Sequence, residues 1–188
     1  MISDKDGPLL TRDASLLLLI DPQVRLMPAI QDGEALAMRF TRLIDAARLL
    51  GVPVLATEHC SQAIGPLLAC IRDRLAPEEI LEKRHFSAWA EPTFRAVLGR
   101  AARRQIVIAG VEAHVCVAQT AMALAQAGHK VFCVTDAVGS RREKDLQAAL
   151  ARFSQAGIVP VTMESVLFEW LESADHPAFK PVLEIIKA

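Results

Sequence analysis

The chain has 188 residues, of which 52% are hydrophobic, and it carries 21 basic against 22 acidic side chains. A chain of this length buries roughly 70% of its unfolded surface, so we expect one domain, residues 1–188, around one sizeable core. The formal net charge of −1 gives no electrostatic basis for binding nucleic acid.

The amino-terminal sequence lacks the basic start and the apolar stretch of a signal peptide. The apolar run at residues 16–20 is far shorter than the roughly 20 residues that a membrane helix needs. We therefore expect a cytoplasmic protein with no membrane partner. The four cysteines, Cys60, Cys70, Cys116 and Cys133, show no CxxC spacing, so neither a disulfide framework nor a zinc site is expected.

Short aliphatic runs alternate with segments of helical period, which is typical of βαβ units on a parallel sheet. Strands are predicted at residues 16–20, 53–56, 80–82, 105–109, 130–134 and 159–162. Helices are predicted at residues 34–50, 93–103, 115–127, 143–155 and 164–171. The expected fold class is α/β, with three α/β/α layers and a central, mostly parallel, six-stranded sheet.

Three reactive side chains follow predicted strands. Asp21 directly follows the first strand, Lys83 follows the third, and Cys116 lies in the turn into the helix after the fourth. Ligands of open parallel sheets bind outside the carboxyl ends of the strands, so these residues can converge there. A nucleophile with a base and a supporting cation is the general arrangement of covalent catalysis.

Each of the three residues also has a simpler interpretation when it is taken alone. At a helix amino terminus Cys116 gains a stabilised thiolate and nearby N–H groups for an oxyanion, yet most buried cysteines only pack. Asp21 precedes Pro22 and can form a turn. Lys83 can be an ordinary exposed lysine.

Longer motifs add to these residues. They are Leu-Ile-Asp-Pro-Gln at 19–23, Gly-Val-Glu-Ala-His-Val-Cys at 110–116 and Thr-Asp-Ala-Val-Gly-Ser-Arg at 135–141. With Lys83 they resemble the isochorismatase-like cysteine hydrolases, a superfamily with a Rossmann-like fold that includes nicotinamidases and N-carbamoylsarcosine amidases. Thr57-Glu58-His59 and the segments 83–87 and 175–180 look most like the isochorismatase domain-containing proteins.

The resemblance implies a catalytic triad without a cofactor. Asp21 takes the thiol proton, Cys116 attacks an amide-like carbon, and Lys83 supports the charged pair. It also implies a cis peptide bond between Val111 and Glu112, with the backbone N–H groups of Glu112 and Cys116 as the oxyanion hole. A dimer or tetramer is implied as well.

The sequence departs from the metal-containing relatives at His59, which has no second histidine close behind it. A lone histidine is more often a satisfied polar residue than a ligand, so we predict no metal and disfavour nicotinamide. Residues near the triad in sequence could line a small pocket, although the two aromatic ones could equally pack in the core or between subunits. These residues are Gln23, Phe86, Trp89 and His114.

The predicted function is a cysteine hydrolase for a small amide, carbamoyl or related substrate, through a covalent Cys116 intermediate. One alternative is a catalytically silent module that binds a small molecule or a protein. Another is an isochorismate-type vinyl-ether hydrolase, but that branch does not require the cysteine. A thiol redox role is disfavoured because no resolving cysteine lies near Cys116 in sequence.

Overall fold

The computed structural model describes residues 7–187. Its centre is a six-stranded sheet of order β3-β2-β1-β4-β5-β6, in which every neighbouring pair is parallel. The strands are β1 (Ser15–Ile20), β2 (Val54–His59), β3 (Ile80–Lys83), β4 (Gln105–Val111), β5 (Lys130–Gly139) and β6 (Val159–Val161). The predicted α/β class and sheet are confirmed.

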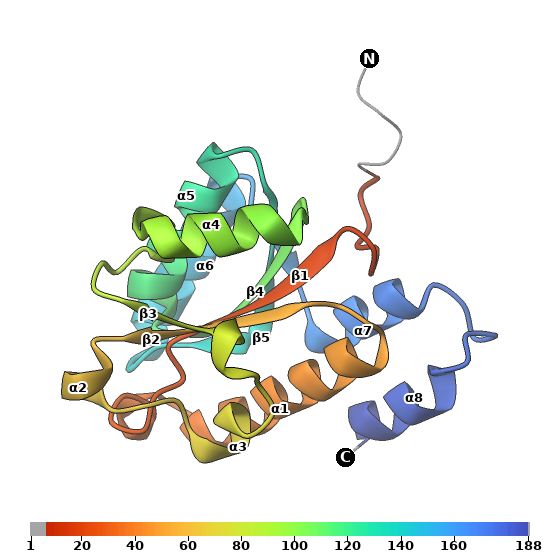
Figure 1. Ribbon diagram of the computed structural model, residues 1–188, viewed down its shortest axis with the longest axis horizontal. Helices are drawn as coiled ribbons and strands as arrows, with labels where there is room; N and C mark the ends of the chain where they lie inside the picture. Colours follow the sequence, from red (N-terminus) through yellow and green to blue (C-terminus); the bar gives the residue numbers. More distant parts are fainter. Residues whose placement is uncertain (1–6, 188) are drawn as a thin grey trace.

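Helices cover both faces of the sheet (Figure 1). The helices α4 (Pro92–Ala101), α5 (Ala118–Gln126) and α6 (Glu143–Gln155) pack on one face. On the other face lie α1 (Gly33–Leu49), α7 (Met163–Leu171), α8 (Phe179–Lys187) and the short α3 (Ala69–Arg72). The described chain also contains α2 (Ser61–Ile64), the π-helical turn η4 (Ala113–Val117) and the 3-10 turns η1 (Met27–Ala29), η2 (Pro77–Glu79) and η3 (Ala88–Ala90).

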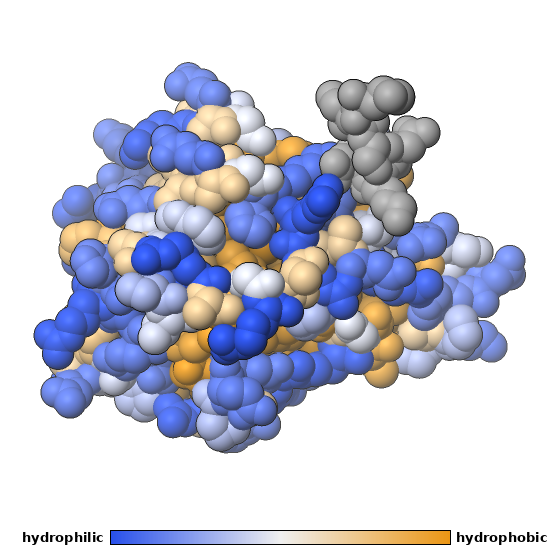
Figure 2. Space-filling view, turned by 45° about the horizontal axis from the view of Figure 1, so that its top comes forward, coloured by the Kyte–Doolittle hydropathy of each residue, from blue (hydrophilic) through white to orange (hydrophobic). Residues whose placement is uncertain are grey.

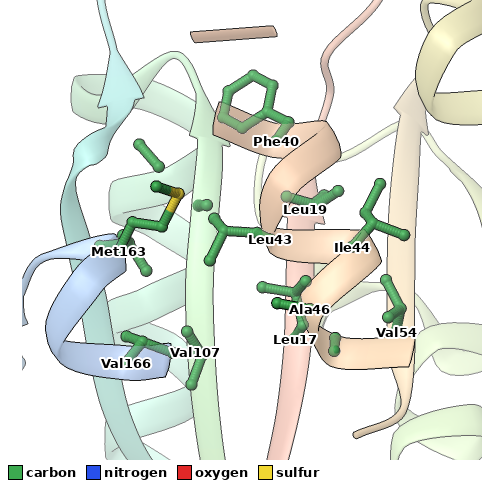
Figure 3. Close-up of a cluster of buried hydrophobic side chains, with 14 of the residues drawn as sticks. Leu17, Leu19, Phe40, Leu43, Ile44, Ala46, Val54, Val107, Met163 and Val166 are labelled. Carbon is green, nitrogen blue, oxygen red and sulfur yellow. The ribbon is translucent and has the colours of Figure 1, made fainter. Parts of the chain in front are cut away.

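The first strand is buried on both faces, which explains its unbroken aliphatic sequence. Leu17 and Leu19 face the layer of α1, where Leu43 and Ile44 pack over them (Figure 3). The alternate residues of the strand belong to the opposite core, beneath α4, α5 and α6. On the viewed outer surface hydrophilic residues predominate, with hydrophobic ones scattered among them (Figure 2). None of the helices within residues 7–187 has the length and apolar character required to cross a bilayer.

The structure differs from the sequence-based elements in three places. The predicted helix 115–127 begins two residues earlier, as the π turn η4, and only then continues as α5. Strand β5 runs on to Gly139, with a shift in its pairing to β4 between Ile108 and Gly110. The prediction also lacks α8, in which Pro181 lies in the first turn, where its missing N–H breaks no helical hydrogen bond.

The order of the strands in the sheet determines where the site lies. The chain runs outward from β1 to β2 and β3, and then returns to pair β4 with the other side of β1. The helices that follow β1 and β4 lie on opposite faces of the sheet, and ligands of open parallel sheets bind at the carboxyl ends of such a strand pair. Asp21 and the η4 turn lie directly after these two strands.

Candidate active site

Asp21 is fully buried at the end of β1, in a left-handed conformation with φ of 52°. Its Oδ1 accepts a hydrogen bond of 2.6 Å from Thr57 Oγ1 on β2, and its Oδ2 lies 2.7 Å from Lys83 Nζ. A carboxylate removed from water needs such partners to remain charged. The neighbouring strands supply both of them.

Lys83 is the last residue of β3, one position inside the strand that was expected to end at residue 82. It is 2% exposed, so the interpretation as an ordinary surface lysine is wrong. Besides Asp21, its Nζ donates to the carbonyl oxygens of His85 at 3.3 Å and Phe86 at 3.2 Å. These acceptors fix the ammonium group at the carboxyl edge of the sheet.

Cys116 lies in the π turn and is 6% exposed. Burial raises the pKa of its thiol to about 12; the charge of Asp21 and a hydrogen bond to it also raise the pKa, while Lys83 lowers it. These effects favour the protonated thiol over the expected resting thiolate, because burial and Asp21 outweigh Lys83. The arrangement can form the thiolate only by passing the thiol proton to a base, and Asp21 is the adjacent one.

Gly110 allows β4 to pass close to β1 directly before the nucleophile turn. It has φ of +122°, and a Cβ at this position would meet Ile20 O at 2.2 Å. The next peptide bond but one, between Val111 and Glu112, is cis. The carbonyl of Glu112 then accepts from the N–H groups of Val115 at 3.0 Å and Val117 at 3.2 Å.

Further polar side chains form hydrogen bonds between the η4 turn and the segment that follows β5. Glu112 is 8% exposed, and its Oε1 accepts a hydrogen bond of 3.0 Å from Arg141. His114 Nδ1 lies 2.9 Å from Ser140 Oγ. Ser140 also lines a hollow of about 120 Å³ at the carboxyl end of β5, together with residues that include Thr135, Asp136 and Arg142. His114, one of the predicted pocket residues, therefore lies beside the residue Ser140 that lines this hollow.

Gln23, predicted as a pocket residue, has its side-chain amide bonded within the protein. It is fully buried, and its Nε2 donates to the carbonyls of His59 at 3.1 Å and Gly65 at 2.6 Å. Its Oε1 accepts from the His59 N–H at 2.8 Å. These bonds occupy the amide, which clamps the end of β2 instead of facing a ligand.

The two predicted aromatic residues lie in different places. Phe86 is exposed, with its ring centroid 5.3 Å from that of His59, at the edge that holds Lys83. Trp89 packs edge-on against His129 at 5.8 Å. His129 precedes β5 and so lies at the opposite, amino edge of the sheet. This contact favours the alternative interpretation of Trp89 as a packing residue.

The structure adds Thr57 and His59 to the site. In the sequence Thr57 stands out only as part of a motif, although its position near the end of a strand beside β1 is a usable signal. The sequence predicts His59 to be a satisfied polar residue, but its Nδ1 is buried and has no hydrogen-bond partner among the described residues. Within residues 7–187 no three His, Cys, Asp or Glu side chains group closely enough to hold a metal ion.

Comparisons with known proteins agree with this geometry. The model of the isochorismatase domain matches residues 15–165. Isochorismatase domain-containing protein 2 of Danio rerio is 32% identical, over 94% of this chain and 89% of the relative. Protein 2A of the same name from Mus musculus is 33% identical, over 93% of this chain and 84% of the relative.

Solved structures show the same likeness. The structure described as MAR1 ribonuclease from Caenorhabditis elegans superposes with a TM-score of 0.90 at 31% identity, over 96% of this chain and 93% of the other. YcaC from Pseudomonas aeruginosa, solved with hexane-2,5-diol and covalent acrylamide, gives 0.89 at 26% identity, over 95% and 91%. An α/β fold with this matched domain defines a hydrolase-type scaffold. The chain belongs to the isochorismatase family.

Proposed function

We propose that the protein is a cysteine hydrolase that cleaves a small amide, carbamoyl or related compound through a covalent Cys116 intermediate. The observation that carries this proposal is the buried Asp21–Lys83 ion pair of 2.7 Å, which interacts with the thiol of Cys116. Three elements far apart in sequence supply these groups. A base, a cation and a nucleophile at one sheet edge have the roles of nucleophilic catalysis.

In the acylation step, Asp21 takes the proton of Cys116 as Sγ bonds to the carbonyl carbon of the substrate. The C=O electrons move to oxygen and return as the C–N bond breaks, and the amine leaves with the proton held by Asp21. Water then attacks the thioester and gives a proton to Asp21. The C–S bond breaks, and the thiolate recovers that proton. Lys83 stabilises the negative charge that passes between Cys116 and Asp21.

We assign the oxyanion hole to the backbone N–H groups of Glu112 and Cys116. Both residues belong to the turn after β4, which Gly110 brings against β1. Backbone donors fixed by a turn stabilise the developing oxyanion without reorganising. This assignment agrees with the role that the resemblance implies.

A catalytically silent binding module is disfavoured by the same ion pair. A buried ion pair is poor evidence for stability, because the cost of removing two charges from water often cancels their attraction. A module that only binds has no need of such a pair beside a thiol. We propose no cofactor, since all the groups that the reaction requires come from this chain.

The test is a screen of small amides, carbamoyl compounds and lactams, with mass spectrometry of the intact protein to trap an adduct on Cys116. We expect turnover with at least one compound and a Cys116 adduct on the same compound. Cys116→Ala should fold, by circular dichroism, and lose activity. If that variant keeps most of the activity, the reaction is instead of the vinyl-ether type, with Asp21 as general acid.

One structural relative is described as a ribonuclease, so RNA belongs in the screen. We propose that this chain does not act on nucleic acid, because its net charge of −1 supplies no excess of cations for a phosphate backbone. Cleavage of RNA that depends on Cys116 or Asp21 would overturn this part of the proposal. A small molecule remains the proposed substrate.

We also propose that the protein is a cytoplasmic homo-oligomer. YcaC from Escherichia coli is described as an octameric hydrolase of unknown specificity, and its fold matches this chain with a TM-score of 0.86 at 24% identity. The resemblance in the sequence implies a dimer or a tetramer. The dimer, the tetramer and the octamer would each contain only copies of this chain.

A further inference from the structure

His59 lies beside the ion pair but has no part in the chemistry described so far. It is the last residue of β2 and is paired in register with Lys83. Side chains alternate along a strand, so His59 projects from the same face as Thr57, whose hydroxyl bonds Asp21. The imidazole therefore lies on the side of the sheet edge where Asp21 and Lys83 meet.

The backbone of His59 is held unusually firmly. Gln23 accepts from its N–H at 2.8 Å and donates to its carbonyl at 3.1 Å. The ring packs against Phe86 at 5.3 Å between centroids. A side chain on such a fixed backbone keeps its direction, which is what a recognition group requires.

The ring nevertheless leaves one polar atom without a partner. Nδ1 is buried and forms no hydrogen bond among the described residues. Burial, and then the charge of Lys83, lower the pKa of His59, which favours the neutral form of the ring. Buried polar atoms are nearly always paired, and an unpaired one beside reactive groups is a position where a bound ligand can supply the partner.

Chemistry favours one kind of partner. A neutral imidazole has one N–H and one lone pair. An orphaned buried N–H is rarer than an unused acceptor, so the tautomer that places the lone pair on Nδ1 fits the observed environment. A ligand that donates an N–H to this atom would satisfy it.

We propose that His59 recognises the substrate, with Nδ1 accepting a hydrogen bond from an N–H of the group that Cys116 attacks. The inference rests on the proposed function and deepens it, because it names the substrate as a primary amide, carbamoyl or urea-like compound that carries an N–H beside the reacting carbon. Esters and ketones of the same shape lack that donor. His59 is thus a specificity residue.

Two small electrophiles test this on the full-length protein. Acrylamide and methyl vinyl ketone share a vinyl carbonyl, and the NH₂ group of the first is replaced by CH₃ in the second. In both, the thiol sulfur bonds to the terminal vinyl carbon, and the thiol proton ends on the carbon next to the carbonyl. The measurement is the rate of each Cys116 adduct by peptide mass spectrometry, divided by the rate for free N-acetylcysteine.

We expect His59→Phe to slow the acrylamide reaction about tenfold and to leave the ketone within twofold, because the lost bond is one to an N–H. His59→Asn restores an acceptor and should recover part of the selectivity. His129→Phe is the matched control, since His129 packs against Trp89 at the opposite sheet edge, and it should change neither rate.

The two proposals fail in different ways. If His59→Phe leaves the ratio of the two rates unchanged, whether both rates fall together or neither does, His59 is not a recognition group and the inference is wrong. If the wild-type protein forms no Cys116 adduct with either reagent, the nucleophile itself is wrong, and both proposals are overturned.

Discussion

At the scale of single residues, the site depends on a charge pair held out of water. Asp21 and Lys83 are both at most 2% exposed, and each also forms hydrogen bonds to other groups, Asp21 through Oδ1 and Lys83 through Nζ. Removing one member leaves the other charged and unpaired in the interior, which costs about 3–5 kcal/mol. The pair therefore links stability to activity.

Lys83→Met should lower the free energy of unfolding by about 3–5 kcal/mol and abolish reaction at Cys116. Adding Asp21→Asn removes the orphaned charge, so the double variant should regain part of the stability and none of the activity. Urea denaturation measures both. Lys187→Met, at an exposed pair with Glu184, is the control and should change stability by less than about 1 kcal/mol. Equal effects at the two lysines would contradict this account.

Thr57→Val should reduce kcat/KM about tenfold or more, because the hydroxyl that orients the Asp21 carboxylate is lost from a buried, charged hydrogen bond. Thr41→Val provides the same chemical change on α1, where the hydroxyl bonds only the nearby Met38 carbonyl. That control should retain full activity. Similar losses in both variants would show that the Thr57 hydroxyl has no special role.

The two buried thiols make the free energy of unfolding depend on pH. Burial raises the pKa of Cys116 and of Cys133 to about 12, from an ordinary value of 9.0. Between these pH values the unfolded chain has lost protons that the folded chain keeps, so the free energy of unfolding falls as pH rises above about 9. Below that range both states are protonated, and this contribution is constant.

Denaturation curves from pH 8 to 10.5 should show that decline, and Cys116→Ala should make it shallower. The absolute stability of the variant can differ, since only the slope reports the thiol. A slope that is the same in the variant and the wild type would mean that Cys116 is not a protonated, buried thiol.

At the scale of elements, the sequence predicted the sheet and its crossover helices because aliphatic runs and helical periods mark them. The same topology placed Asp21, Lys83 and Cys116 at one edge, since strands of a parallel sheet end together. Gln23 and Trp89 could not be placed in this way. Their contacts are with His59, Gly65 and His129, which are far away in sequence, and periodicity carries no information about such pairs.

Gly110→Ala tests the close approach of β4 to β1. A Cβ would lie 2.2 Å from Ile20 O and 2.5 Å from Ile20 N, directly before Asp21, so stability and Cys116 reactivity should both fall sharply. Gly99→Ala, in α4, meets nothing within 4 Å and should stabilise the chain by about 0.5–1 kcal/mol. Thermal melts of the two variants decide this. A Gly110→Ala protein that is as stable and reactive as wild type would contradict the packing described.

At the scale of the whole molecule, one parallel sheet collects a nucleophile, a base and a cation from three segments. The proposed homo-oligomer is tested by light scattering on the eluting protein. We expect a mass of at least two chains, each of 20.5 kDa. A single species at 20.5 kDa would show that the chain is a monomer.

The central claim is that Asp21 activates Cys116 as the nucleophile. It is tested most directly by peptide mapping of acrylamide adducts near neutral pH, in the wild type and in Asp21→Asn. We predict that Cys116 reacts before Cys60, Cys70 and Cys133, and that Asp21→Asn, folded by circular dichroism, slows it by about 10²-fold or more. Faster labelling of another cysteine, or an unchanged Cys116 rate without the Asp21 carboxylate, would contradict the account.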